Sequence, residues 1–121
     1  DARRFEVGTL PYQDYAAAVA SLELILELGV DAIAGHVAML TDRIVEWAVT
    51  QPSVRLVTPA AHERRAGIMT LAMDGARATS DRLRAAGVVH SFREGAVRLA
   101  PHLFNTMDDV ERALELLGCR V

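Results

Sequence analysis

Two short segments on either side of the dipeptide Glu94-Gly95 constrain the fold more than any other part of the chain. Residues 96–100 place the polar Arg98 between the apolar Val97 and Leu99, and residues 88–93 contain valine and phenylalanine, a composition typical of strands. A two-residue connection with glycine suits a tight antiparallel turn, because glycine tolerates a positive φ angle. We therefore expect a β-hairpin here, whose apolar face must be buried against another layer.

Two helical segments are expected in the N-terminal half of the chain. The first begins near Asp14 and stops at Gly29, where glycine is a common end signal. It is apolar on several sides, so we expect it to be well buried. Asp31 is placed to cap a second helix, whose apolar side chains recur at steps of four and three and which ends at Gln51-Pro52.

Two further strands and two further helices complete the pattern. Residues 54–57 and 68–73 are strand candidates, and residues 58–67 between them form an exposed loop. A third helix follows residue 74 and stops at Gly87.

Thr106 is placed to cap the last helix, with Asp109 returning the capping hydrogen bond. The expected element order is ααββαββα. Helices that follow and precede short strands in this way pack against a sheet, because a sheet with one apolar face must bury it. We therefore predict an α+β fold, with a small, mostly antiparallel sheet and helices packed on one side.

Length and composition fit one globular domain. The chain has 121 residues, of which 51% are hydrophobic and 24% charged. A net charge of −3, with the arginines scattered among acidic residues, argues against a nucleic-acid partner. No apolar run of membrane-spanning length and no signal peptide is visible, and neither the histidines nor Cys119 have metal-ligand spacing. We expect a cytoplasmic protein with no membrane or nucleic-acid partner and no metal site.

Two stretches of the chain resemble a known family. Residues 91–109, Ser-Phe-Arg-Glu-Gly-Ala-Val-Arg-Leu-Ala-Pro-His-Leu-Phe-Asn-Thr-Met-Asp-Asp, resemble the C-terminal signature of class V aminotransferases, which are pyridoxal phosphate (PLP) enzymes of fold type I. Residues 4–9, Arg-Phe-Glu-Val-Gly-Thr, are similar to the stretch where the large domain of those enzymes passes into the small one. The resemblance implies that residues 1–121 are the C-terminal small domain of such an enzyme, without its large cofactor-binding domain.

The resemblance implies roles for four residues. The family arginine that matches Arg98 grips the α-carboxylate of an amino-acid substrate, and Arg93 matches a position that is often basic. The family threonine that matches Thr9, next to Gly8, hydrogen-bonds the PLP phosphate of the neighbouring subunit in a dimer. Arg98 and Arg93 are therefore candidate substrate-binding residues, Gly8 and Thr9 are candidate cofactor-binding residues, and the full-length enzyme is expected to be a homodimer.

The residue pattern around Arg98 is compatible with carboxylate binding. Alternation along the strand sends its side chain to the face opposite Val97 and Leu99. A guanidinium group can contact both oxygens of a carboxylate, which fixes orientation as well as charge. The residues alone leave open a structural ion pair of Arg98 with Glu94 or Asp108.

The residues after this strand are similar to the family stretch Pro-His-x-Tyr-Asn-Thr, with Phe104 in place of the usual tyrosine. Asn105 is expected to satisfy backbone groups at the junction between strand and helix. His102 is either a second structural residue at this junction or a contact to substrate.

The chain contains no lysine, because all thirteen basic residues are arginine. It cannot form the Schiff base with which PLP chemistry starts, so the 121-residue chain alone is predicted to be inactive. Cysteine desulfurases carry a nucleophilic cysteine on a loop shortly before the carboxylate-binding arginine. The only thiol of this chain, Cys119, lies after Arg98, in the C-terminal tail. Transaminase, epimerase and kynureninase-like lyase chemistry remain open. The alternative function is a free-standing α+β binding or interaction module without catalysis.

Overall fold

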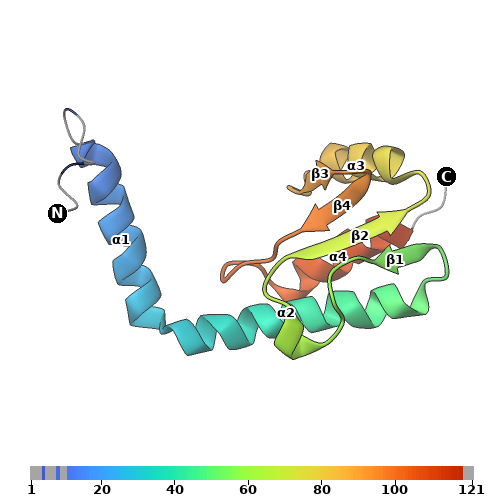
Figure 1. The fold of residues 1–121 in the computed structure, drawn as a ribbon, viewed down its shortest axis with the longest axis horizontal. Helices are drawn as coiled ribbons and strands as arrows, with labels where there is room; N and C mark the ends of the chain where they lie inside the picture. The colour runs from blue at the N-terminus through green and yellow to red at the C-terminus, as the bar shows by residue number, and fades with distance from the viewer. Residues whose placement is uncertain (1–3, 5–7, 9–10, 119–121) are drawn as a thin grey trace. The chain divides into compact units, whose positions relative to one another are not determined.

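The computed structural model of the chain describes Arg4, Gly8 and residues 11–118. Its helices and strands follow one another in the order α1 (Tyr12–Leu28), α2 (Val30–Thr50), β1 (Val54–Leu56), β2 (Met69–Met73), α3 (Ala76–Ala85), β3 (Ser91–Arg93), β4 (Ala96–Leu99) and α4 (Met107–Gly118) (Figure 1). A short 3-10 helix, His62–Arg64, lies in the loop between β1 and β2. The predicted order ααββαββα is confirmed.

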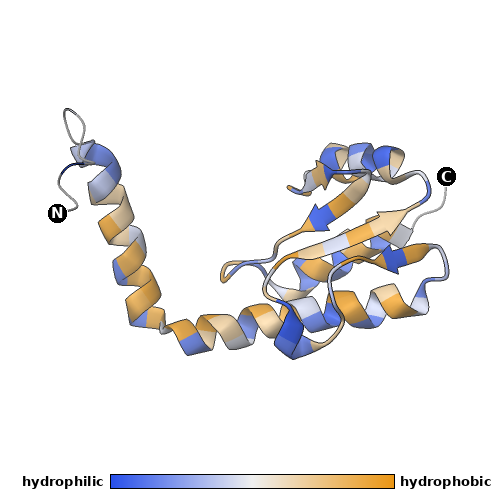
Figure 2. Cartoon of the chain, viewed as in Figure 1, coloured by the Kyte–Doolittle hydropathy of each residue, from blue (hydrophilic) through white to orange (hydrophobic). Residues whose placement is uncertain are grey.

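The chain divides into two compact units, residues 1–33 and residues 34–121. In the first unit, α1 ends at Gly29, whose φ is +83 and whose N–H donates to the carbonyl of Ile25 at 2.9 Å. No residue of α1 is buried, although hydrophobic residues recur along the whole helix (Figure 2). Among them, Leu22 and Leu24 lie on different sides of the helix, and both are exposed. The expectation of a well-buried first helix is therefore wrong for the described part of the chain. None of the helices that the structure describes has the length and hydrophobicity needed to cross a membrane.

The start of α2 differs from the sequence-based expectation. The helix begins at Val30, so Asp31 lies in its first turn and is not its N-cap. A carboxylate in the first turn is still favourable there, because it faces the positive end of the helix dipole. Further along, Leu40 and Ile44 are buried as the periodicity predicted.

The second unit is built on an antiparallel sheet with the strand order β1-β2-β4-β3. Alternate residues of its two central strands are buried on one face, and they pack against apolar side chains of α2, α3 and α4. The strand members of this core are Met69, Leu71, Val97 and Leu99. The helical members include Leu40, Ile44, Leu83, Val110, Leu114 and Leu117. The predicted α+β fold, with helices on one side of a small antiparallel sheet, is confirmed.

The hairpin of β3 and β4 closes through a two-residue turn. Glu94 and Gly95 have φ angles of 51° and 76°, so both adopt the left-handed conformation that a tight hairpin with native strand twist requires. Across the hairpin, Arg93 pairs with Ala96 and Ser91 with Arg98. The turn therefore determines which residues of β3 lie beside Arg98.

The last helix, α4, begins with the predicted capping box. The backbone N–H of Asp109 donates to Thr106 Oγ1 at 3.2 Å, and the backbone N–H of Thr106 donates to Asp109 Oδ2 at 2.9 Å. Two N–H groups that the helix leaves unpaired are satisfied in this way. The hydrogen bond from Thr106, followed by the one from the Asn105 side chain, holds the pKa of Asp109 below its ordinary value.

Candidate functional site

The face of the sheet opposite the helices carries a cavity of about 430 Å³. The residues that matter for its chemistry come from every strand, and we refer to them as the arginine face: Arg55, Thr70, Ala72, Arg93, Ala96 and Arg98. Alternation explains the set, because their neighbours in sequence, such as Val97 and Leu99, point into the helix-covered core. The structure therefore brings the predicted residues Arg93 and Arg98 into one cavity.

Strand register arranges the arginine face in rows. Ala72 on β2 pairs with Arg55 on β1 on one side and with Ala96 on β4 on the other, and Ala96 in turn pairs with Arg93 on β3. Arg98 belongs to the next row, where its partner on β2 is Thr70. Short side chains thus form the centre of the face, and arginines stand around them. This leaves room for a ligand between guanidinium groups.

Among the described residues, the three arginines of this face make no hydrogen bond and no ion pair. Neither Glu94 nor Asp108 pairs with Arg98. The structural ion pair that the sequence left open for Arg98 is therefore absent from the described part of the chain. Other arginines of the chain behave differently. Arg43 contacts both carboxylate oxygens of Glu111, at 2.5 and 3.1 Å.

The charge of the cavity is positive. Three arginines line it, and Glu94, in the exposed hairpin turn at its edge, is the acid among the described lining residues. An unpaired guanidinium group presents N–H donors in a fixed planar arrangement that matches a carboxylate or another oxyanion. The arginine face is therefore suited to bind an anion, and Arg98, half-buried on the central strand β4, is the best placed residue to do so.

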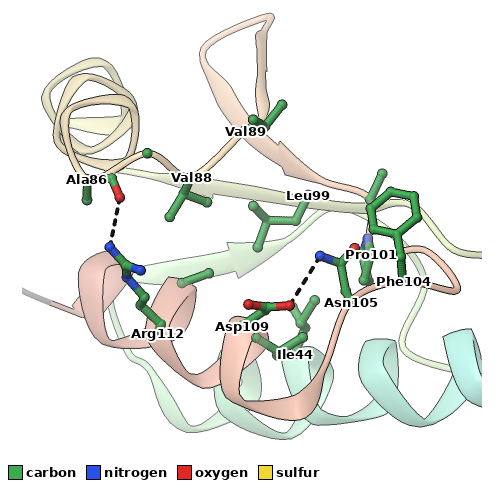
Figure 3. A pocket seen from close by; sticks show the side chains of 14 residues that line it. Ile44, Ala86, Val88, Val89, Leu99, Pro101, Phe104, Asn105, Asp109 and Arg112 are labelled. Carbon is green, nitrogen blue, oxygen red and sulfur yellow. Dashed lines mark hydrogen bonds between the residues drawn. The ribbon is translucent and has the colours of Figure 1, made fainter.

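A second cavity, of about 370 Å³, lies on the helix side of β4 (Figure 3). Its polar side chains are engaged within the fold. Asn105 Nδ2 donates to Asp109 Oδ2 at 3.5 Å, and Arg112 Nη2 donates to the carbonyl of Ala86 at 3.0 Å. The remaining lining is largely apolar, with Leu99 and Phe104 among its residues. This cavity therefore lacks the free cationic groups that the arginine face offers.

Asn105 and His102 occupy the junction between β4 and α4. Asn105 Oδ1 accepts the backbone N–H of His102 at 3.0 Å, so the structural role predicted for Asn105 is confirmed. The ring of His102 lies beside the ring of Phe104, with 5.3 Å between their centroids, and it does not line the arginine face. No group of three or more potential metal-ligating side chains occurs in the described part of the chain.

The two candidate cofactor residues are placed differently. Thr9 lies outside the described residues. Gly8 lies in a bend with a φ of +72°, and a Cβ atom added there would meet nothing within 4 Å. The glycine is thus explained by its backbone angle, since φ in this range is strained for other residues.

Sequence reasoning did not single out Arg55 or Thr70. The signal for Arg55 was present, because it lies between Val54 and Leu56 just as Arg98 lies between Val97 and Leu99. Alternation alone places each arginine opposite its own apolar neighbours. It could not indicate that both strands pair with β2 and that both arginines therefore share one face.

Comparison with known proteins assigns the fold to a family. Residues 34–117 match the family model described as Kynureninase C-terminal domain, which is more than half of the chain. The chain belongs to this family. The resemblance to the C-terminal domain of class V aminotransferases, which the sequence indicated, is thereby confirmed.

The relatives of this family member are about three times as long as the chain. It is 29% identical over 119 residues to a Bacillus subtilis (strain 168) protein named "Uncharacterized aminotransferase YcbU", covering 98% of the chain and 32% of that relative. The cystine C-S lyase C-DES, solved with its reaction product cysteine persulfide, matches with a TM-score of 0.82 at 22% identity, covering 96% of the chain and 32% of C-DES. A C-DES mutant in which glycine is covalently linked to the PLP cofactor matches with the same TM-score and identity, covering 96% and 31%. At this identity the solved structures establish the fold.

Proposed function

We propose that this chain is the C-terminal part of a PLP-dependent enzyme that acts on an amino acid, and that Arg98 binds the α-carboxylate of the substrate. The observation that carries the proposal is an arginine without a partner among the described residues, half-buried on an open sheet face that also carries Arg93. Leaving a guanidinium group unpaired is costly where water is partly excluded, so such a group is typical of a binding site.

The energetics favour a carboxylate as the ligand of Arg98. A hydrogen bond to an ionised partner is worth about 1.5–3 kcal/mol, and a bidentate arginine contact adds geometric specificity. Binding both oxygens holds the carboxylate in the plane of the guanidinium group and thereby orients Cα. Arg93, on the neighbouring strand, is proposed as a second donor to the same anion. These two residues would bind and orient the substrate, and neither is assigned a proton-transfer step.

The residues of this chain fit the PLP cofactor only in part. The chain has no lysine, so the Schiff base must come from another part of the enzyme, and we expect the isolated chain to be inactive. When bound, PLP supplies an electron sink for bonds broken at Cα. Gly8 and Thr9 are proposed to contact its phosphate in the neighbouring subunit of a homodimer, through hydroxyl and backbone donors.

The remaining length of the relatives supports a missing large domain. The chain spans 32% of the curated relative, so two thirds of such a protein would lie outside it. The exposed apolar side chains of α1, among them Leu22 and Leu26, form a surface typical of contact with another domain or subunit. We propose that α1 is covered in the intact enzyme.

A free-standing α+β binding module without catalysis is the second candidate. The absence of lysine favours it, since such a module needs no Schiff base. It would use the arginine face to hold an anion as well. The two candidates differ in whether a PLP-binding lysine is present in the same natural polypeptide, which the length and sequence of the parent reading frame decide.

Substitution of Arg98 in the intact enzyme tests the proposed function. Arg98→Gln should weaken amino-acid binding by about tenfold or more, because one charged contact is lost, and should leave the affinity for PLP within about twofold. Arg98→Lys should recover part of the binding, since a point charge remains but the bidentate geometry does not. Spectroscopic titration with amino acid and with PLP measures both affinities.

Arg84→Gln is the matched control. Arg84 is an exposed arginine on α3 that pairs with Asp81 at 3.4 Å and does not line the arginine face. Its substitution should change neither affinity. Equal losses of amino-acid and PLP binding in Arg98→Gln would contradict the role assigned to Arg98.

A further inference from the structure

The arginine face carries more positive charge than one α-carboxylate requires. Arg93 and Arg98 lie on adjacent strands of the hairpin and suffice for a single anion. Arg55 lines the same cavity from the other end of the sheet, on β1. Like the other two arginines, it makes no hydrogen bond or ion pair within the described part of the chain.

Register places Arg55 at a definite distance from Arg98. Strand β2 lies between their strands, and neighbouring strands are about 4.8 Å apart, so strands β1 and β4 are roughly 10 Å apart. Arg55 and Arg98 also stand in successive rows, about 7 Å apart along the strands, so their backbones are separated by roughly 12 Å. Two arginine side chains that rise from these positions can approach a single ligand from opposite ends. The same ligand would have to span the strand between them.

The residues of β2 on this face leave space for such a ligand. Ala72 and Thr70 point to the arginine face, and both are short. The hydroxyl of Thr70 makes no hydrogen bond to any described residue. The backbone of Thr70 is engaged instead: its N–H donates to Thr58 Oγ1 at 2.9 Å, and its carbonyl accepts the N–H of Val57 at 2.9 Å. The hydroxyl is therefore free to donate to a ligand oxygen lying between the two arginines.

We infer that the arginine face binds a ligand with two carboxylates, one held by Arg98 and the other by Arg55. The inference rests on the proposed role of Arg98 and adds a substrate class to it, namely an acidic amino acid or the corresponding dicarboxylic acid. Arg55 is then the residue that distinguishes dicarboxylates from monocarboxylates. Its unpaired charge attracts the second carboxylate and makes the site less suited to a neutral side chain.

Calorimetric titration of the intact protein with simple acids tests this inference without relying on turnover. Glutarate serves as the dicarboxylate, butyrate as a monocarboxylate of similar length, and inorganic phosphate as a compact anion. Glutarate should bind at least about tenfold more tightly than butyrate, because it makes a second charged contact. Phosphate should bind more weakly than glutarate, because it cannot reach both arginines.

Variants separate the two carboxylate contacts. Arg55→Gln should weaken glutarate binding by about tenfold and leave butyrate binding within about twofold. Arg55→Lys should retain part of the preference, since the charge is kept. Arg98→Gln should weaken both acids, and Arg84→Gln should weaken neither. The circular dichroism spectrum and thermal unfolding of each variant should match those of the parent protein, because the substituted side chains lie outside the helix-covered core.

The outcomes distinguish a failure of this inference from a failure of the proposed function. If Arg98→Gln weakens both acids but Arg55→Gln weakens neither, or weakens both equally, the dicarboxylate inference is wrong and the role of Arg98 stands. If phosphate binds as tightly as glutarate, the site is a general anion site and the inference is also wrong. If Arg98→Gln leaves both affinities unchanged, the proposed function itself fails.

Discussion

Thr70 on β2 lies directly opposite Arg98 on β4, so the hydroxyl and the guanidinium group project from neighbouring strands to the same face of the sheet. One row further along, Ala72 and Ala96 are paired in the same way. The centre of the face is therefore made of side chains too short to fill it. The positive charge stands at its margins, and a ligand can lie flat on the strands between.

Ala72→Leu should block this space. The larger side chain would fill the centre of the face beside Arg55, so binding of glutarate should fall by about tenfold, while the free energy of unfolding should change by no more than about 0.5 kcal/mol. Calorimetry and denaturant unfolding give the two quantities. Ala85→Leu, an exposed position on α3, is the control and should leave binding unchanged. Undiminished binding in Ala72→Leu would place the ligand elsewhere.

Gly67→Ala should destabilise the protein by about 1–3 kcal/mol, because a Cβ atom at this position would lie 2.8 Å from Val37 Cγ1 and overpack the contact between the loop and α2. Denaturant unfolding measures the loss. Gly35→Ala provides the opposite case, since Gly35 lies within α2 with nothing within 4 Å of its added Cβ, and it should stabilise by up to about 1 kcal/mol. The double variant Gly67→Ala with Val37→Ala removes the methyl group that the new Cβ atom would meet, so it should recover part of the lost free energy of unfolding.

Asp109 should give the protein a stability that depends on pH. Its pKa in the folded state lies below the ordinary value of 3.8, so its contribution is present above that pH and is lost as the pH falls through the lower folded-state pKa. Thermal unfolding from pH 6 down to pH 2 should show Asp109→Asn less stable than the parent protein near neutrality, with the difference shrinking below about pH 4.

Asp108→Asn is the control for this pH series. Asp108 lies in the same first turn of α4 but accepts no hydrogen bond from any described residue. Its substitution should not reproduce the effect of Asp109→Asn. A difference between Asp109→Asn and the parent protein that persists unchanged to pH 2 would refute the assignment to the Asp109 carboxylate.

His90 should carry its proton on Nδ1 when the ring is neutral. Nδ1 lies 2.9 Å from the carbonyl oxygen of Val88, which can only accept, so Nε2 is left to accept the hydroxyl of the buried Ser80 at 2.7 Å. Nitrogen-15 NMR of the imidazole ring distinguishes the two tautomers. Ser80→Ala should remove the hydrogen-bond partner of His90 Nε2 and change the nitrogen-15 chemical shift of that atom. A ring protonated on Nε2 in the parent protein would contradict this geometry.

Features that depend on a few neighbouring residues could be predicted from the sequence. The capping box of Thr106 and Asp109 and the turn at Glu94-Gly95 are examples, because their hydrogen bonds and backbone angles involve residues close together in the chain. The start of α2 was less predictable, since Asp31 is as acceptable in the first turn as at the N-cap.

Features that depend on pairing between distant strands could not be predicted. The pattern Val54-Arg55-Leu56 indicates a strand but not its partner, so the position of Arg55 on the face of Arg98 became visible only with the register of β2. The exposure of α1 was missed for a related reason. Hydrophobicity on several sides of a helix favours burial, but it does not indicate whether the same segment of chain supplies a surface to bury it.

The two-residue turn at Glu94-Gly95 has a consequence for natural variation. Strand β4 is held in place by β2, so adding or deleting one residue in the turn would slip β3 by one position unless a bulge absorbed it. Such a slip would turn Phe92 toward the open face and Arg93 toward the helices. Among evolutionary relatives that retain a basic residue at the position of Arg93, insertions and deletions at this loop should therefore occur in even numbers or not at all.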